Sequence, residues 1–170
     1  MFVILYLLFF IFGVIFGGSG VWIMLYHKKT MQDVQIVGMQ KNLDMMNQWL
    51  ILKHMGISID TILKKRNINI IAIYGMGICG RHLVRELEKA DIKVCYGLDV
   101  KVKQAYKGIP IYKPGKTEDS VDAVINTVCY DEVGIAKILQ QYYKCPIINL
   151  SELIHMGYPD GIVVNKKERF

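Results

Sequence analysis

The four cysteines of this 170-residue chain form no C-x-x-C pair. Cys79, Cys95, Cys129 and Cys145 lie far apart, and this spacing excludes a thioredoxin-like redox motif and the usual zinc-ligand arrangement. We therefore predict reduced, mostly buried thiols and no metal centre. Such thiols are typical of the cytoplasm, where disulfides are rare.

Signatures of catalysis are also missing. No lysine follows the glycine-rich segment around residues 75–80 in the Walker order, which excludes a P-loop NTPase. A short-chain dehydrogenase or epimerase would offer a helical Tyr-x-x-x-Lys, but the spacing from Tyr112 to Lys116 contains Pro114 and Gly115 and cannot lie inside a helix. The histidines are scattered, and no second domain is left to hold a substrate. We expect no catalytic residue.

The first 26 residues carry no charged side chain. As a helix, Phe2 to Tyr26 would be about 37 Å long, enough to cross a hydrocarbon core of about 30 Å with tilt. A cleaved signal peptide is the alternative, but a basic n-region and a small-residue cleavage site are lacking. We predict a single-pass anchor over residues 1–29. Because Lys28 and Lys29 follow the span, the positive-inside rule places the rest of the chain on the cytoplasmic side of the cell membrane.

The basic excess of the chain lies next to this span. His27 to Asn67 holds seven cations against three anions, so +4 of the net charge of +6 lies there. We expect anionic membrane lipid as its partner. Nucleic acid is not expected, because the chain has neither a helix-turn-helix pattern nor an aromatic-basic platform. Gly13-x-x-x-Gly17 allows two membrane helices to approach and form a homodimer, although glycine is also common in membrane helices that stay apart.

Residues 30–66 are predicted as an amphipathic helical linker. An apolar residue recurs at every third or fourth position, which is the spacing of one helix face. This stripe comprises Ile36, Met39, Leu43, Met46 and Leu50. Two heptads are too few for a coiled coil, so we expect the stripe to pack on the following domain or to lie at the membrane surface. Gly56 is expected to end the helix, and Ser58 to cap a short second helix reaching Arg66.

Over residues 67–155, short apolar runs alternate with helical patterns, which indicates βαβ units. The predicted fold class is α/β, a Rossmann-like parallel sheet of about five strands preceded by one transmembrane helix and the linker helix. The expected strands are Ile68 to Tyr74, Lys93 to Leu98, Ile109 to Tyr112, Ala123 to Val128 and Pro146 to Leu150. The expected helices are Ile78 to Ala90 and Glu132 to Tyr143. Residues 156–170 form a C-terminal tail in which Ile162 to Val164 are a candidate edge strand.

A Gly75-x-Gly77-x-x-Gly80 loop joins the first expected strand to the first expected helix, and Asp99 ends the next strand. This order is typical of a dinucleotide-binding unit. Gly75 would permit the tight turn, Gly77 the approach of a pyrophosphate, and Gly80 the packing of the helix on the sheet. Amides near Ile78 would face the phosphates. Asp99 would accept hydrogen bonds from the ribose hydroxyls, which favours NAD over NADP because a 2′-phosphate would meet like charge.

The predicted cofactor-binding residues lie in this loop, at the strand-end acid and at the end of the fourth expected strand. They are Gly75, Met76, Gly77, Ile78, Cys79, Gly80, Asp99, Asn126 and Thr127. We expect Asn126 and Thr127 on the nicotinamide or sugar side, near the point where strand order reverses. The predicted cofactor is NAD, with NADP or a nucleotide sugar as alternatives. An empty glycine turn and a solvated strand-end acid are the structural alternatives.

The chain from Asn47 to Leu153 resembles small Rossmann-like modules associated with bacterial capsule and exopolysaccharide production. The resemblance rests on Asn47-Gln-Trp-Leu, Ile73-Tyr74-Gly75-Met76-Gly77, Gly97-Leu98-Asp99, Gly108-Ile109-Pro110-Ile111 and Asp122-Ala123-Val124-Ile125. Similar units form the nucleotide-binding half of membrane-anchored nucleotide-sugar dehydratases and the N-terminal domain of sugar acyltransferases. The resemblance implies a nucleotide, nucleotide-sugar or NAD-type ligand at the glycine loop and Asp99. This chain carries no attached catalytic or acyltransferase domain.

The predicted function is a membrane-anchored, cytoplasm-facing module that binds a dinucleotide or nucleotide sugar, accessory to surface polysaccharide biosynthesis. One alternative is an NAD(P)-dependent nucleotide-sugar oxidoreductase or epimerase subunit completed by a partner chain. Another is a scaffold with a vacant nucleotide site. The expected partners are membrane lipid, a nucleotide-type small molecule, and either a second copy of the chain or a protein of polysaccharide biosynthesis.

Overall fold

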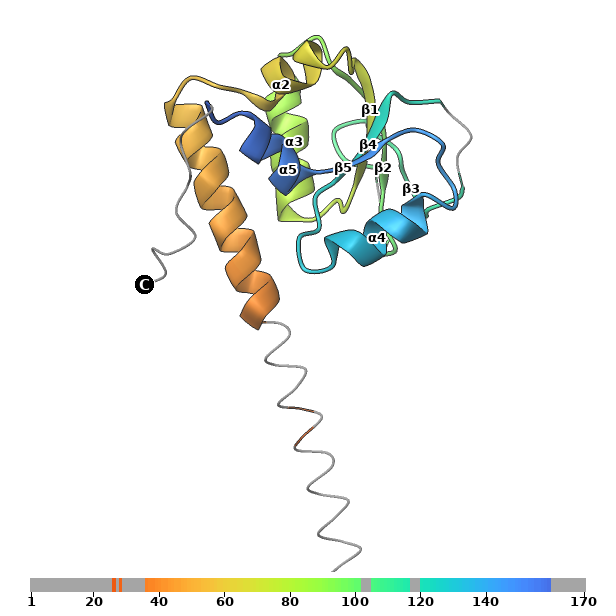
Figure 1. Ribbon diagram of the computed structural model, residues 1–170. Coiled ribbons are helices and arrows are strands. Elements are labelled where there is room, and N and C mark those ends of the chain that lie inside the picture. Colours follow the sequence, from red (N-terminus) through yellow and green to blue (C-terminus); the bar gives the residue numbers. More distant parts are fainter. Residues whose placement is uncertain (1–25, 27, 29–35, 102–104, 117–119, 160–170) are drawn as a thin grey trace, which may run out of the picture. The chain divides into compact units, whose positions relative to one another are not determined.

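The computed structural model describes residues 26, 28, 36–101, 105–116 and 120–159 (Figure 1). The chain divides into two units, Met1–Gln40 and Lys41–Phe170, and the fold below is that of the second unit. Apart from Tyr26, the expected membrane span lies outside the described residues, as does the candidate edge strand of the tail. In the described ranges, no helix combines the length and the apolar composition that crossing a bilayer requires.

A parallel five-stranded sheet in the order β3-β2-β1-β4-β5 forms the centre of the second unit (Figure 1). Its strands are β1 (Ile70–Tyr74), β2 (Lys93–Leu98), β3 (Ile111–Tyr112), β4 (Ala123–Asn126) and β5 (Ile147–Asn149). Strands β1 and β4 lie inside the sheet and are covered on both faces, which explains why their sequences are almost continuously apolar. The predicted α/β class with a Rossmann-like sheet is confirmed at this level.

Four short helices cover the sheet: α2 (Ile59–Lys65), α3 (Ile78–Leu87), α4 (Glu132–Leu139) and α5 (Leu150–Met156). Side chains of α2, α3 and α5 share one hydrophobic core, and those of α4 belong to a second core on the other face (Figure 1). Helices α3 and α4 end earlier than predicted. The sequence pattern does not predict helix α5, which begins at Leu150, a residue expected at the end of the last strand.

The register of the central strands brings three chain segments together. Tyr74, the last residue of β1, pairs with Leu98 of β2 and with Asn126 of β4. The Gly75 amide then donates to the Leu98 carbonyl (2.8 Å), and the Thr127 amide donates to the Tyr74 carbonyl (3.0 Å). The loops that follow β1, β2 and β4 therefore start at one edge of the sheet. Strand order reverses at this edge, which is where doubly wound sheets bind ligands.

The helix that precedes α2 contributes to the main core. Residues 36–54 are helical, and Met45, Trp49 and Leu52 are buried against the α3 side of the sheet. Within this unit, Leu43 (66% exposed) and Leu50 (53% exposed) of the predicted stripe are exposed, whereas Met46 packs against the core. Of the two expected places for the stripe, packing on the domain is found for Met46 and not for Leu43 or Leu50, and a place at the membrane surface stays a prediction. Apolar side chains occupy two faces of this helix, and the face that carries the large tryptophan is the buried one.

A buried carboxylate fixes this helix and α2 onto α3. The Glu86 side chain is 6% exposed and pairs with the Lys53 ammonium at 2.9 Å. Glu86 also accepts hydrogen bonds from Trp49 Nε1 (3.0 Å) and from the amide of Ile59 (2.9 Å). Ser58 occupies the N-cap position of α2, as predicted, but its side chain does not cap the helix. The Ser58 hydroxyl forms a hydrogen bond with the Thr61 hydroxyl, and the Glu86 carboxylate accepts the bond from the first helical amide.

Candidate functional site

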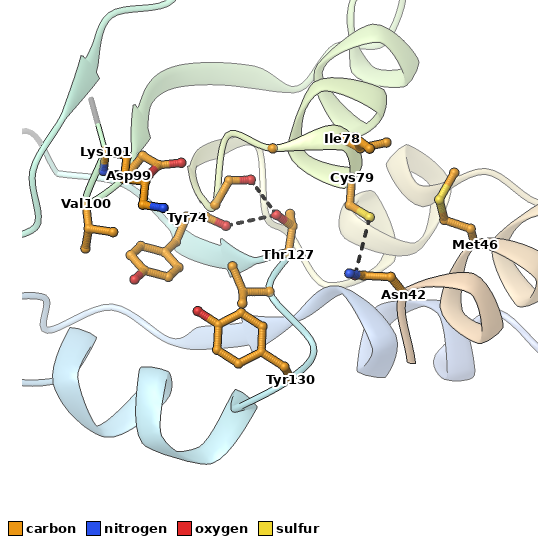
Figure 2. A pocket seen from close by; sticks show the side chains of 13 residues that line it. Asn42, Met46, Tyr74, Ile78, Cys79, Asp99, Val100, Lys101, Thr127 and Tyr130 are labelled. Carbon is orange, nitrogen blue, oxygen red and sulfur yellow. Dashed lines mark hydrogen bonds between the residues drawn. The ribbon is translucent and has the colours of Figure 1, made fainter. Parts of the chain in front are cut away.

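A cleft of about 370 Å³ opens above the ends of β1, β2 and β4 (Figure 2). Its volume falls within the range of about 300–1,000 Å³ that is usual for small-molecule sites. The lining comes from the helix before α2, the glycine loop and the segments after β2 and β4. The lining residues are Asn42, Met46, Tyr74, Gly75, Gly77, Ile78, Cys79, Asp99, Val100, Lys101, Thr127, Val128 and Tyr130.

Two of the three motif glycines are required by the packing of the protein itself. Gly75 has a φ of 89°, and a Cβ there would lie 2.6 Å from a methyl group of Val128. A Cβ on Gly80 would lie 2.2 Å from the Gly75 carbonyl oxygen, so the first turn of α3 could not pack against the loop. A Cβ on Gly77 would meet nothing within 4 Å. The space above Gly77, at the N-terminus of α3, is therefore open to a ligand.

Asp99 ties the end of β2 to the glycine loop. Its Oδ2 accepts a hydrogen bond from the Met76 amide (3.0 Å), and its Oδ1 accepts one from the Lys101 amide (2.9 Å). Each carboxylate oxygen can accept a further hydrogen bond, because it carries more than one lone pair. Asp99 can therefore hold the loop and still accept a hydrogen bond from a ligand hydroxyl in the cleft.

Thr127 supports the loop from the β4 side. Its buried hydroxyl donates its one proton to the Gly75 carbonyl oxygen (2.6 Å) and shares it with the Tyr74 carbonyl oxygen (3.0 Å), as the dashed lines in Figure 2 show. The strand end and the first glycine are thereby held in one conformation. The loop is preorganised by contacts on both sides, with Asp99 on the β2 side and Thr127 on the β4 side.

Two tyrosines line the cleft near Asp99. Burial raises the pKa of the Tyr74 phenol, and the nearby Tyr130 and Asp99 raise it further. The Tyr74 hydroxyl is therefore neutral at physiological pH and can donate a hydrogen bond. Tyr130 is 61% exposed and offers an aromatic face at the rim of the cleft. Both side chains are suited to binding, and the Tyr74 phenol is not activated as a base.

The cleft has a second end, formed by the helix before α2. The Cys129 thiol donates a hydrogen bond to Asn42 Oδ1 (2.8 Å), and the Cys79 thiol lies at 4.0 Å from the same oxygen. Burial raises the pKa of both thiols, and Cys79 raises that of Cys129 further. Both groups are therefore protonated donors at neutral pH and not nucleophiles. All four cysteines of the chain are free, with two buried and two half-buried.

The structure brings most of the predicted site residues together. Six of them line the cleft: Gly75, Gly77, Ile78, Cys79, Asp99 and Thr127. Met76 and Gly80 shape the loop from behind, since the Met76 side chain is buried and Gly80 packs against the loop backbone.

Asn126 does not line the cleft, contrary to its expected place on the nicotinamide side. It is 1% exposed, and its Nδ2 donates to Asn149 Oδ1 (2.9 Å) and to the Val128 carbonyl (3.2 Å). Its Oδ1 accepts from the Val128 amide (3.0 Å). The side chain is used to join the ends of β4 and β5.

Several lining residues were not predicted as site residues: Asn42, Met46, Tyr74, Val100, Lys101, Val128 and Tyr130. Five of these lie within three residues of a predicted strand end, so a search along each strand end would have found them. Asn42 and Met46 come from a helix outside the motif, and nothing in its sequence marks them as cleft residues. They are placed by the packing of Trp49 and Leu52 on the domain.

In comparisons with protein-family models, with curated proteins and with solved structures, no significant match to this chain was found. The function is therefore argued from the site. Among the described residues, no three His, Cys, Asp or Glu side chains gather as metal ligands would.

Proposed function

We propose that the chain binds a dinucleotide, NAD, in this cleft. The observation that carries the proposal is the open space above Gly77, between a loop fixed by Asp99 and Thr127 and the first turn of α3. Backbone amides at a helix N-terminus favour phosphate oxygens through hydrogen bonds and the helix dipole. The diphosphate would lie above Gly77. The protein itself has room for a side chain at this position, so a bound ligand would explain the glycine.

The strand-end acid and its neighbours suit the adenosine part of such a ligand. Asp99 has acceptor capacity left for two ribose hydroxyls, and Val100 and Tyr130 offer apolar and aromatic surface nearby for a base. A 2′-phosphate would meet the Asp99 charge, so NAD is favoured over NADP. Lys101 also lines the cleft and reduces this preference without reversing it.

The proposed role is binding and not turnover. The charged side chains among the described lining residues are Asp99 and Lys101, and no histidine lines the cleft. Tyr74, Cys79 and Cys129 have raised pKa values, which keeps them neutral. The sequence resemblance supports an accessory or regulatory role in surface polysaccharide biosynthesis, and the uncharged N-terminal span followed by Lys28 and Lys29 supports a membrane-anchored, cytoplasm-facing module.

The test uses the full chain purified in detergent. Native mass spectrometry would identify a retained nucleotide, and calorimetric titration would measure the affinities for NAD, NADP and a nucleotide sugar such as UDP-glucose. We expect NAD to bind more tightly than NADP. Absence of binding to any of the three by well-folded protein would refute the proposal, and tighter binding of UDP-glucose than of NAD would replace the dinucleotide by a nucleotide sugar.

A further inference from the structure

The two ends of the cleft differ in chemistry. One end, after β2, carries Asp99 and Lys101, and the glycine loop lies between it and the other end (Figure 2). The other end is formed by Asn42 and Met46 with the first turn of α3. No charged side chain lines this end among the described residues, although the charges of Lys41 and Glu132 act on the neighbouring Cys129 thiol. A ligand with its ribose at Asp99 and its diphosphate at the loop would place its remaining half at this uncharged end.

The orientation of the Asn42 side chain is fixed by its surroundings. A thiol donates hydrogen bonds, so the amide oxygen is the atom that faces Cys129, at 2.8 Å, and Cys79, at 4.0 Å. The amide nitrogen Nδ2 has no hydrogen-bond partner among the described residues. Since Asn42 lines the cleft with its oxygen occupied, Nδ2 is the group that it offers to a ligand.

We propose that Asn42 is a specificity-determining residue, which binds the half of the ligand beyond the diphosphate by donating a hydrogen bond from Nδ2 to an uncharged acceptor oxygen. In NAD this acceptor is the carbonyl oxygen of the nicotinamide carboxamide. The inference rests on the proposed function, because that function sets which part of the ligand reaches Asn42. It adds that the helix before the sheet is part of the binding site.

The rest of this end supports the assignment. Met46 and Cys79 provide polarisable, uncharged surface against which a flat ring can lie. The helix that carries Asn42 is held on α3 through Glu86, which binds Trp49 and pairs with Lys53. Asn42 is thus presented to the ligand from a fixed element, and the two thiols act as positioning residues for its amide.

The test compares ADP, which ends at the diphosphate, with NAD, which continues to the nicotinamide. The variant Asn42→Leu keeps roughly the size of the side chain and adds no charge, but it cannot donate a hydrogen bond. Calorimetric titration of the full chain in detergent should show about a tenfold loss of NAD affinity, the value of one hydrogen bond, with ADP affinity unchanged. Asn47→Leu, at an exposed position of the same helix, is the matched control and should leave both affinities unchanged.

A second pair of variants tests the positioning by the thiols. Cys129→Val removes the closer donor and frees the Asn42 amide to turn, so NAD affinity should fall while ADP affinity does not. Cys129→Ser restores a donor and should recover most of the NAD affinity. A purely structural role of Cys129 would instead change the affinities for NAD and ADP equally.

The outcomes separate the two proposals. Wild-type protein that binds neither ADP nor NAD would refute the proposed function, and this inference with it. Wild-type protein that binds both, with Asn42→Leu weakening neither or weakening both equally, would overturn the role of Asn42 alone. A selective loss of NAD affinity, at an unchanged unfolding temperature of the free protein, would support it.

Discussion

The amide of Met76 and the carboxylate of Asp99 are joined by a hydrogen bond of 3.0 Å. The acid at the end of β2 is thus part of the glycine loop's support as well as a candidate ribose ligand. Substitutions of Asp99 therefore act through the loop and through the ligand at once, and a single alanine variant cannot separate the two effects.

We expect Asp99→Ala to weaken NAD binding by about 1.5–3 kcal/mol, the range for hydrogen bonds to a charged group. NADP should lose less, because the change also removes a repulsion of its 2′-phosphate. Asp99→Asn keeps an oxygen for the Met76 amide but removes the charge, so its NAD affinity should lie between those of wild type and Asp99→Ala. Calorimetric titration measures the NAD affinity of wild type, Asp99→Ala and Asp99→Asn. Equal NAD affinity in all three proteins would exclude Asp99 from the site.

Gly77→Asp is expected to abolish NAD binding and leave the fold intact. A side chain at position 77 meets no protein atom within 4 Å, but its bulk and negative charge would stand where the diphosphate is proposed to lie. Thermal unfolding of the free variant should match that of wild type, while titration with NAD should show no heat of binding. The matched control is Gly80→Ala, which should destabilise the free protein because its Cβ would lie 2.2 Å from a backbone oxygen. Undiminished NAD binding by Gly77→Asp would mean that the loop is not the phosphate site.

The fold was predictable from sequence because its signals are local. Alternating apolar runs and helical patterns marked all five strands, and β2 was predicted with the bounds that the structure has, Lys93–Leu98. Helix α5 was missed because it starts directly after β5, with Leu150 as its first residue, so strand and helix merge in one apolar run. The helix over residues 36–54 buries the face that carries Trp49, which donates a hydrogen bond to Glu86. Glu86 lies 37 positions further along the chain, so no local sequence pattern indicates this contact.

The candidate site was predictable where it follows the glycine motif and the strand ends. Gly75, Gly77 and Asp99 could be predicted because the glycine spacing occurs together with a preceding strand, a following helix and an acid at the end of the next strand. Asn126 was assigned to the cleft by its position, but alternation along β4 and the bond to Asn149 turn it away. Asn42 is brought to the cleft by tertiary packing, and nothing in its sequence surroundings indicates this.

Thr127 is expected to stabilise the free protein through the loop. Thr127→Val keeps the shape of the side chain but removes the hydroxyl that bonds to the Tyr74 and Gly75 carbonyls. The Gly75 carbonyl then loses a buried partner, so the free energy of unfolding should fall by about 1–3 kcal/mol. Thr127→Ser keeps the hydroxyl and should retain most of the wild-type free energy of unfolding. Urea unfolding checks both, and unchanged stability of Thr127→Val would show that the loop does not depend on this contact.

The membrane topology is tested on intact cells. Because Lys28 and Lys29 follow the uncharged span, residues 67–170 should resist protease added outside the cells and become sensitive once the membrane is opened. Digestion with the membrane still sealed would reverse the orientation. A mature chain that starts after residue 26 would instead indicate a cleaved signal peptide.

The thiols at the cleft lead to a prediction on pH. Burial raises the pKa of Cys79 and Cys129 above the usual 9.0, so the folded protein holds these protons more tightly than the unfolded chain. Their contribution to stability is therefore fully present below pH 9 and is lost as the pH rises through the raised values. We expect the free energy of unfolding of wild type to fall as the pH rises above 9, and to fall less in Cys129→Ser, whose hydroxyl does not ionise there. Urea unfolding at a series of pH values measures this difference.

Alkylation of the thiols is a second check. Iodoacetamide at pH 7 should react slowly with Cys79 and Cys129 while the protein is folded. Rapid alkylation at pH 7, or a parallel alkaline loss in the serine variant, would show that Cys129 is not the neutral donor to Asn42 that its 2.8 Å contact indicates.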